Sequence, residues 1–239
     1  MHIEQSDFHD HLVRGLAHKM NNILSLFHGY LGLLLEDKKL DRETLAGLAR
    51  IREGANAAAE LMDRTKAFAK PTSTVWREIE VDDFLKQLTP AMETFAANGV
   101  RLEIVCEEKL PRLWVDLSRL RTAVLEIVRN ACEASPAGGL VTIDARIDAR
   151  RARVRGTSRA TAPITWVALT VTDEGEGIAP GIAKKIFQPF FSTKHKGAMG
   201  LGLSVALGLV QQLGGVIRFS SKPGRTSFRM LLPSRTERN

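Results

Sequence analysis

The sequence has no long hydrophobic run and almost no cysteine. It contains no stretch of about 18 consecutive apolar residues, and its N-terminus lacks a basic segment followed by an apolar core. We therefore expect no membrane-spanning segment, no secretory signal and a cytoplasmic location. The two cysteines, Cys106 and Cys132, do not have the spacing of metal ligands, which indicates buried thiols in a reducing compartment.

Aromatic residues are absent where basic residues are most frequent. The net charge is +7 and the isoelectric point is about 9.7. No aromatic residue lies between Asp144 and Thr165, so this part of the chain has no surface on which bases could stack, and we expect no nucleic-acid partner. The interpretation we favour is a solvated connection between two strands, with contact to an acidic partner as the alternative. Its arginines are Arg146, Arg150, Arg151, Arg153, Arg155 and Arg159.

Two common nucleotide-binding motifs are also missing. Residues 197–204 have the glycine spacing of a P-loop, but Leu203 occupies the position of the phosphate-binding lysine. The dinucleotide pattern G-x-G-x-x-G fails because Pro180 and Val205 stand where a third glycine is needed. These observations exclude a P-loop NTPase and a dinucleotide-binding fold.

The first 72 residues have the pattern of two helices. Residues 4–35 repeat apolar side chains at helical spacing, and residues 42–69 carry a narrower apolar stripe. Two antiparallel helices cannot bury both stripes by pairing with each other alone, so we expect a homodimer with a four-helix bundle. The apolar residues of the first helix are Leu12, Leu16, Met20, Ile23, Leu24, Phe27, Leu31 and Leu34.

Residues 73–239 alternate between strand and helix patterns and predict a second domain. We expect an α+β fold in which helices cover one face of a mixed sheet, as an α/β sandwich. The predicted strands are residues 77–81, 100–107, 113–116, 139–150, 163–173, 215–221 and 226–232, and the predicted helices are residues 82–97, 117–134 and 201–213, with a short helical piece before residue 186.

A carboxylate and two glycines follow the strand VALTVTDEGEGI at residues 167–178. The strand brings Asp173 to the edge of the sheet, where a buried carboxylate needs strong hydrogen-bond donors such as an adenine amino group. Gly175 and Gly177 lack Cβ atoms, so their backbone can approach a flat ring closely. This stretch predicts a site for a nucleotide base.

Lysines and glycines precede the predicted helix 201–213 and indicate a phosphate site. Gly200, Leu201 and Gly202 lie at the helix N-terminus, where free N–H groups and the helix dipole favour anions. Lys194, the last residue of the aromatic segment FQPFFSTK, and Lys196 are candidates for the β- and γ-phosphates.

The predicted helix 117–134 carries two polar residues four positions apart. Glu126 and Asn130 share one helix face, so a carboxylate and an amide oxygen can point together into a pocket. A solvated helix face is the ordinary alternative for such a pair.

These segments together resemble the GHKL ATPases, in the version found in sensor histidine kinases of the nitrogen-regulation type. The resemblance covers about residues 10 to 233 and includes LAHKMNN at residues 16–22, which is similar to the H box. It implies that His18 accepts the γ-phosphoryl group of ATP and that Asn22 orients water in the reverse, phosphatase reaction. The phosphoryl group would then pass to an aspartate of a response-regulator receiver domain.

The same resemblance implies roles for residues of the second domain. LEIVRNACEA is similar to the N box, which implies Asn130 as a Mg²⁺ ligand and Glu126 as a polar residue near the transferred phosphate. A single amide is sufficient because magnesium takes its other ligands from phosphates and water. Thr226 matches a hydroxyl position that helps to hold Asp173 and the adenine.

One residue of the H box departs from the family pattern. Most members carry Asp or Glu directly after the histidine, whereas this chain has Lys19, which has no acceptor for the imidazole N–H. The first alternative to an active histidine kinase, favoured by this departure, is therefore a weak kinase that acts mainly as a phosphatase or phosphotransfer protein. A GHKL ATPase that uses Glu126 as a general base is the second.

Overall fold

The computed structural model describes residues 5–36, 40–66, 75–148, 165–194 and 200–234, and it describes side chains of the first helix from Lys19 onward. The chain divides into two compact units, Met1–Thr72 and Ser73–Asn239. None of the helices in the described ranges is long and apolar enough to cross a membrane.

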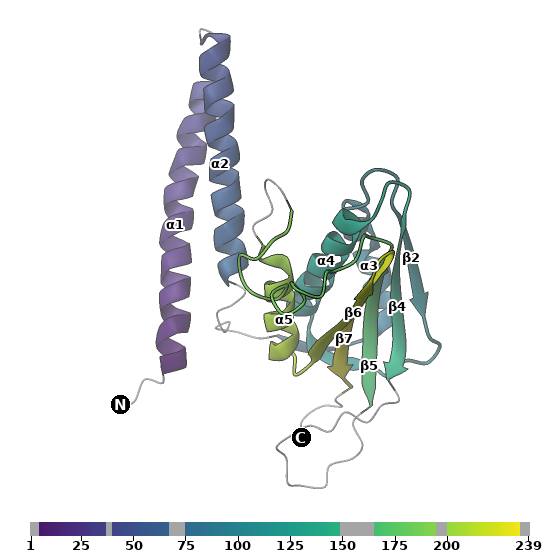
Figure 1. Cartoon of the computed structure of the whole chain (residues 1–239). Helices are drawn as coiled ribbons and strands as arrows, with labels where there is room; N and C mark the ends of the chain where they lie inside the picture. The colour runs from purple at the N-terminus through teal and green to yellow at the C-terminus, as the bar shows by residue number, and fades with distance from the viewer. Residues whose placement is uncertain (1–4, 37–39, 67–74, 149–164, 195–199, 235–239) are drawn as a thin grey trace. The chain divides into compact units, whose positions relative to one another are not determined.

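The first unit is a hairpin of two long helices, α1 (Gln5–Leu35) and α2 (Arg42–Lys66), which run side by side (Figure 1). Asp41 caps the N-terminus of α2, because its carboxylate accepts hydrogen bonds from the backbone N–H and the hydroxyl of Thr44, both at 2.8 Å. Between the helices, His28 Nε2 lies 2.6 Å from Asn56 Oδ1. The helical hairpin expected from the sequence is therefore present.

The apolar face of α1 is only partly covered within one hairpin. Leu24 and Leu31 are buried and Met20 and Leu35 are partly buried, whereas six other large apolar side chains described on α1 are more than two-fifths exposed. The exposed residues are Ile23, Leu26, Phe27, Tyr30, Leu33 and Leu34, and Ile51 of α2 is exposed as well. A single hairpin thus leaves a long apolar strip in contact with water.

The second unit is a two-layer α+β sandwich, as predicted. Helices α3, α4 and α5 cover one face of a five-stranded sheet with the order β2-β4-β5-β7-β6, in which β2 and β4 are parallel and the other neighbours are antiparallel (Figure 1). Strands β1 and β3 form a separate antiparallel pair. The bounds are β1 Trp76–Ile79, α3 Val81–Glu93, β2 Arg101–Cys106, β3 Leu113–Asp116, α4 Leu117–Ala134, β4 Leu140–Asp148, β5 Trp166–Asp173, α5 Gly202–Gln212, β6 Val216–Lys222 and β7 Arg225–Pro233.

The core of this unit lies between the sheet and its helices. Val167, Leu169 and Val171 alternate along the central strand β5 and are at most 1% exposed. Beside them, the ring of Phe228 lies 6.3 Å from the ring of Phe187 in an edge-on contact. These contacts hold the segment after β5 against the sheet and so help to position the site described below.

Two local expectations differ from the structure. The helix expected over residues 82–97 ends at Glu93, because Phe95 N and Ala96 N donate to carbonyls three residues back, and Asn98 and Gly99, with φ angles of 55° and 75°, then turn the chain toward β2. The short helical piece expected before residue 186 is a series of turns instead. Its hydrogen bonds join residues three apart, such as Lys185 N to Ile182 O at 2.7 Å, and Gly181 disfavours a regular helix there.

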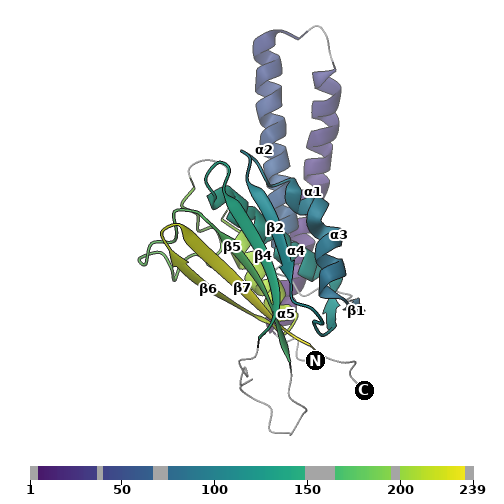
Figure 2. The same ribbon diagram turned by 90° about the vertical axis from the view of Figure 1, so that its right-hand side faces the viewer.

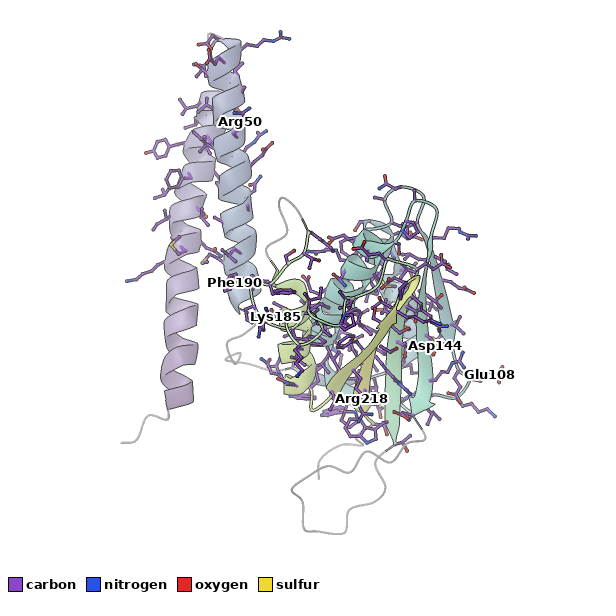
Figure 3. The ribbon with its side chains drawn as sticks, in the orientation of Figure 1. Arg50, Glu108, Asp144, Lys185, Phe190 and Arg218 are labelled. Carbon is purple, nitrogen blue, oxygen red and sulfur yellow. The ribbon has the colours of Figure 1, made fainter. Side chains whose placement is uncertain are left out.

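The packing of Phe228 predicts a large stability effect. Phe228→Ala should lower the free energy of unfolding of the second unit by about 3–5 kcal/mol, since a fully buried ring is replaced by a cavity. Tryptophan fluorescence during urea unfolding measures this unit specifically, because the three tryptophans, Trp76, Trp114 and Trp166, all lie in it. Phe190→Ala is the matched control, because Phe190 is 70% exposed and its loss should have little effect (Figure 3). Equal losses in the two variants would contradict this description of the core.

Candidate functional site

Asp173 ends β5 with its carboxylate buried. The residue is 1% exposed, and Oδ1 accepts a hydrogen bond from Gly175 N at 2.9 Å. Oδ2 is buried and has no hydrogen-bond partner among the described residues. Burial raises the pKa of Asp173, while the Gly175 N–H and the charge of Lys194 act in the opposite direction. One oxygen of this carboxylate is therefore held by the protein and the other is left for an external donor.

The turn after Asp173 needs its two glycines because it lies directly against other backbone. A Cβ atom on Gly175 would lie 2.6 Å from Ala134 O at the end of α4, and one on Gly177, where φ is +89°, would lie 2.7 Å from Lys222 O. Gly224 N also donates to Gly175 O at 3.0 Å. The turn is thus fixed between α4 and the β6–β7 hairpin, a reason for glycine that the sequence pattern did not reveal.

Thr226 lies next to Asp173 in the sheet. The antiparallel register of β5 and β7 pairs these two residues, and Thr226 is 4% exposed. Its hydroxyl lies 2.8 Å from the hydroxyl of Ser221, which also accepts from Ile178 N at 2.8 Å. Ser221 was not singled out from the sequence, although strand alternation in β6 would have placed it on the same sheet face as Thr226.

Helix α4 places the side-chain oxygen atoms of Asn130 and Glu133 next to Lys194. Asp116 caps the helix by accepting from Ser118 N at 3.0 Å and Arg119 N at 3.2 Å. Further along, Asn130 Oδ1 accepts from Lys194 Nζ at 3.3 Å, and the same ammonium forms an ion pair with Glu133. Glu133 was missed in the sequence, but its position three residues after Asn130 places it on the same helix face.

Glu126 lies beside the N-terminus of α5. A Cβ atom on Gly202, the first residue of α5, would lie 2.8 Å from Glu126 Oε2, so any other residue would require the carboxylate to move away from the helix. Glu126 is 7% exposed, and its Oε1 lies 3.7 Å from Arg129 Nη1. Gly200 has a φ of +65°, and a Cβ there would lie 2.6 Å from the backbone of Phe190. The α5 N-terminus is thus packed closely against both α4 and the aromatic segment.

The structure brings together most of the site residues expected in the second unit. Asp173, Gly175, Gly177 and Thr226 form one group, Asn130 and Lys194 a second, and Glu126, Gly200, Leu201 and Gly202 a third. Lys196 lies outside the described residues. His18 lies in α1 of the first unit, with Lys19 and Asn22 exposed on the same helix.

The two cysteines are free thiols, and Cys132 is buried as expected, whereas Cys106 at the end of β2 is only partly buried. Cys132 lies in α4 between Asn130 and Glu133, and burial, with a smaller effect of the charges of Glu133 and Asp173, raises its pKa to about 11. Burial likewise raises the pKa of Cys106. Within the described ranges, no three His, Cys, Asp or Glu side chains are grouped as metal ligands.

Comparison with known proteins identifies the family of the second unit. The model of the histidine kinase-, DNA gyrase B- and HSP90-like ATPases matches residues 115–236, from β3 to the end of β7. The chain belongs to this ATPase family. Its buried carboxylate, its glycine turn and the α4 face with Asn130 all lie within the matched part.

The similarity to individual members of this ATPase family extends into the helical hairpin. Sensor kinase CckA of Brucella abortus is 30% identical over 228 residues, which cover 93% of this chain and 24% of CckA. The sensory histidine kinase/phosphatase NtrB of Salmonella typhimurium is 33% identical over 232 residues, which cover 94% of this chain and 62% of NtrB. The chain thus spans about a quarter to three-fifths of the length of these relatives.

A solved structure shares the fold. Full-length ShkA, crystallised with AMPPNP, matches 96% of this chain and 47% of its own length, with a TM-score of 0.73 and 22% sequence identity. At this level of identity the match supports the architecture alone.

The buried carboxylate predicts a specific dependence of stability on pH. Because the pKa of Asp173 is raised above its ordinary value of 3.8, the folded chain binds a proton there at a higher pH than the unfolded chain does. Stability contributed by this group therefore increases as the pH falls through the raised pKa toward 3.8. The free energy of unfolding of the natural chain, compared with that of Asp173→Asn, should therefore increase as the pH is lowered.

Urea unfolding followed by tryptophan fluorescence at several pH values tests this expectation. Glu176→Gln is the control, because it removes an exposed carboxylate from the same turn. A difference between the natural chain and Asp173→Asn that stays constant with pH would show that burial does not perturb this group.

Proposed function

We propose that this chain is the catalytic core of a two-component sensor histidine kinase. It would bind Mg-ATP in the second unit, transfer the γ-phosphoryl group to His18, and pass it to an aspartate of a response-regulator receiver domain. The single observation that carries the proposal is the Asp173 carboxylate, which is fully buried and has one oxygen without a donor among the residues that the structure describes. A buried acceptor in this state fits an exocyclic amino group such as that of adenine.

The phosphate end of the nucleotide would lie between α4 and the N-terminus of α5. Lys194, Gly200, Leu201 and Gly202 would bind the phosphates through an ammonium group and free backbone N–H groups. Lys194 is now paired with Glu133, so nucleotide binding would exchange a carboxylate partner for a phosphate partner.

The face of α4 also has the chemistry that a magnesium ion needs. Asn130 and Glu133 offer oxygen atoms, and both already contact a cationic group, the ammonium of Lys194. Asn130 would hold the ion, which when bound would neutralise charge on the phosphates. Glu126 would be a polar neighbour of the transferred group.

The acceptor would be provided by the helical hairpin. A neutral imidazole nitrogen of His18 would attack the γ-phosphorus, an N–P bond would form, the bond from the γ-phosphorus to the β,γ-bridging oxygen would break, and ADP would leave. Asn22, one helical turn later, would orient water for the reverse reaction on the regulator. The names of CckA and NtrB as sensor kinases support this assignment, and a cytoplasmic location remains a prediction.

A homodimer is part of the same proposal. Ile23, Phe27, Tyr30 and Leu34 lie on one side of α1 and are exposed in a single hairpin. Covering them with the same strip of a second chain would form a four-helix bundle and remove a large apolar area from water.

A second candidate function, net dephosphorylation of the regulator, is favoured by Lys19. This side chain is exposed and directly follows His18, and an ammonium cannot accept the imidazole N–H. NtrB is named both a kinase and a phosphatase. A third possibility, ATP hydrolysis with Glu126 as the base, is less favoured because an ATPase of that kind has no use for the segment LAHKMNN, residues 16–22, on the helical hairpin.

The first experiment is labelling with γ-³²P ATP. The natural chain should acquire an acid-labile, base-stable label, and His18→Gln should lose it while still binding ATP, because the acceptor and the pocket lie in different units. Asp173→Asn should lose both the label and ATP binding, measured by calorimetry, since it presents a donor to the adenine amino group.

His28→Gln is the matched control for the acceptor. His28 lies on the same helix and contacts Asn56, and its replacement should leave the label in place. A label that persists in His18→Gln would exclude His18 as the acceptor. Release of free phosphate without any label would favour the ATPase.

The Lys19 position gives a separate kinetic prediction. Lys19→Glu should raise the initial rate of His18 labelling by about tenfold or more, because a carboxylate there can accept the imidazole N–H and general-base assistance is large. ATP affinity should not change. A single-turnover assay, with nucleotide binding measured in parallel, tests this. A variant that labels no faster would assign Lys19 to phosphate binding or to regulator docking.

A further inference from the structure

One face of the five-stranded sheet carries no helix in the described part of the chain. Figure 2 views the sheet from this side, with the strands in front of the helices. Strand alternation places every second residue of β6 and β7 here, because the intervening residues, such as Phe228 and Met230, are buried under the helices. We call this the open face; its residues are Val216, Arg218, Ser220 and Lys222 of β6 and Arg225, Ser227, Arg229, Leu231 and Pro233 of β7, of which Leu231 and Pro233, at one end, are buried.

The open face of β6 and β7 contains two cross-strand pairs of like charge. The register places Arg218 directly opposite Arg229, and Lys222 directly opposite Arg225 (Figure 3 labels Arg218). Like charges directly opposite each other on neighbouring strands are destabilising; Asp148, 3.4 Å from Arg229, offsets part of the repulsion at the first pair, whereas Lys222 and Arg225 form no ion pair within the described ranges. Two such pairs on one hairpin indicate a surface arranged to meet negative charge.

Hydroxyl groups separate the two cationic pairs. Ser220 and Ser227 are paired between them, and the hydroxyl of Ser227 lies 2.9 Å from that of Thr172 on β5. Along β6, the cationic pairs are four residues apart, or roughly 13 Å at the usual rise of a strand. The surface therefore offers two positive positions with hydrogen-bonding groups between them. A patch of carboxylates on another protein can reach both positions at once.

Two carboxylates of β4 border this patch. Asp144 of β4 pairs with Arg146 at 2.7 Å, and Asp148 of β4 lies 3.4 Å from Arg229. The open-face positions of β5, β6 and β7 include no acidic residue. Within the described ranges, Arg218 and Arg225 form no ion pair, so their charges are available to a partner.

We propose that the outer face of β6 and β7 is a docking surface for an acidic patch of another protein, in which carboxylates meet Arg218 and Arg225. A guanidinium binds a carboxylate through two parallel hydrogen bonds, and the intervening hydroxyls bind further acceptors. A protein fits better than a nucleic acid, because the positive patch is short and is bordered by Asp144 and Asp148, which suits a compact group of carboxylates better than a continuous line of phosphates. The aromatic residue of this face, Trp166, is also buried and presents no stacking surface.

The proposed docking surface on β6 and β7 is separate from the nucleotide site. Asp173 and Thr226 point to the helix-covered face, so substitutions at Arg218 and Arg225 leave the nucleotide-binding residues in place. Loss of docking and loss of labelling can therefore be distinguished in the same preparation.

The binding test uses a fluorescein-labelled oligoglutamate peptide as the probe, followed by fluorescence anisotropy at low salt. The double variant Arg218→Ser/Arg225→Ser should bind it about tenfold more weakly than the natural chain, and added salt should remove the difference. The matched control is Arg77→Ser/Arg121→Ser, which removes the same charge from exposed positions of β1 and α4 and should bind nearly as the natural chain does. Equal losses in both double variants, or no binding, would overturn the proposal.

Two further measurements keep the inference falsifiable. A short DNA duplex that binds through the same two arginines more tightly than the peptide would assign the face to nucleic acid and overturn the protein partner. Arg218→Thr should raise the urea midpoint of the second unit at low salt by relieving the pair with Arg229, whereas Arg77→Thr, opposite Val115, should not. A lower midpoint for Arg218→Thr would show that the like-charge pairs serve stability rather than binding.

Discussion

The burial of one carboxylate at the end of β5 is the constraint on which the arrangement of the second unit depends. A charged group that is 1% exposed is unfavourable unless it is hydrogen bonded, and within the described part of the chain the Gly175 N–H is the one donor to its oxygens. The glycine turn, the β5–β7 register and the end of α4 all contribute to this environment. The unfavourable burial of this carboxylate thus lies where a bound ligand can supply the missing hydrogen bond, and such local destabilisation is common at functional sites.

The sequence was sufficient to predict most of the fold. The strand ending at Asp173 and the helix ending at Ala134 were located closely, because each has an unambiguous apolar period and a clear polar or glycine boundary. The turns after Gly177 were predicted less well. Their short-range hydrogen bonds produce spacings that resemble helix, and local sequence does not distinguish the two.

The candidate site was predictable by residue type but not by contact. Asp173, Asn130 and the glycines follow from motif and chemistry, whereas the pairing of Lys194 with Glu133 joins segments far apart in the chain. The close fit of Gly202 against Glu126 is likewise a tertiary contact. Such contacts depend on how helices and sheet pack, which no local pattern encodes.

The parallel pairing of β2 with β4 affects how the second unit assembles. Neighbouring antiparallel strands such as β6 and β7 can pair through a tight turn, but β2 reaches β4 only after β3 and α4 have crossed over the sheet. The loop-closure entropy of that crossover opposes the pairing until the helix is packed. The edge formed by β2 is therefore expected to join the sheet late in folding and to be its first part to separate when the unit is destabilised.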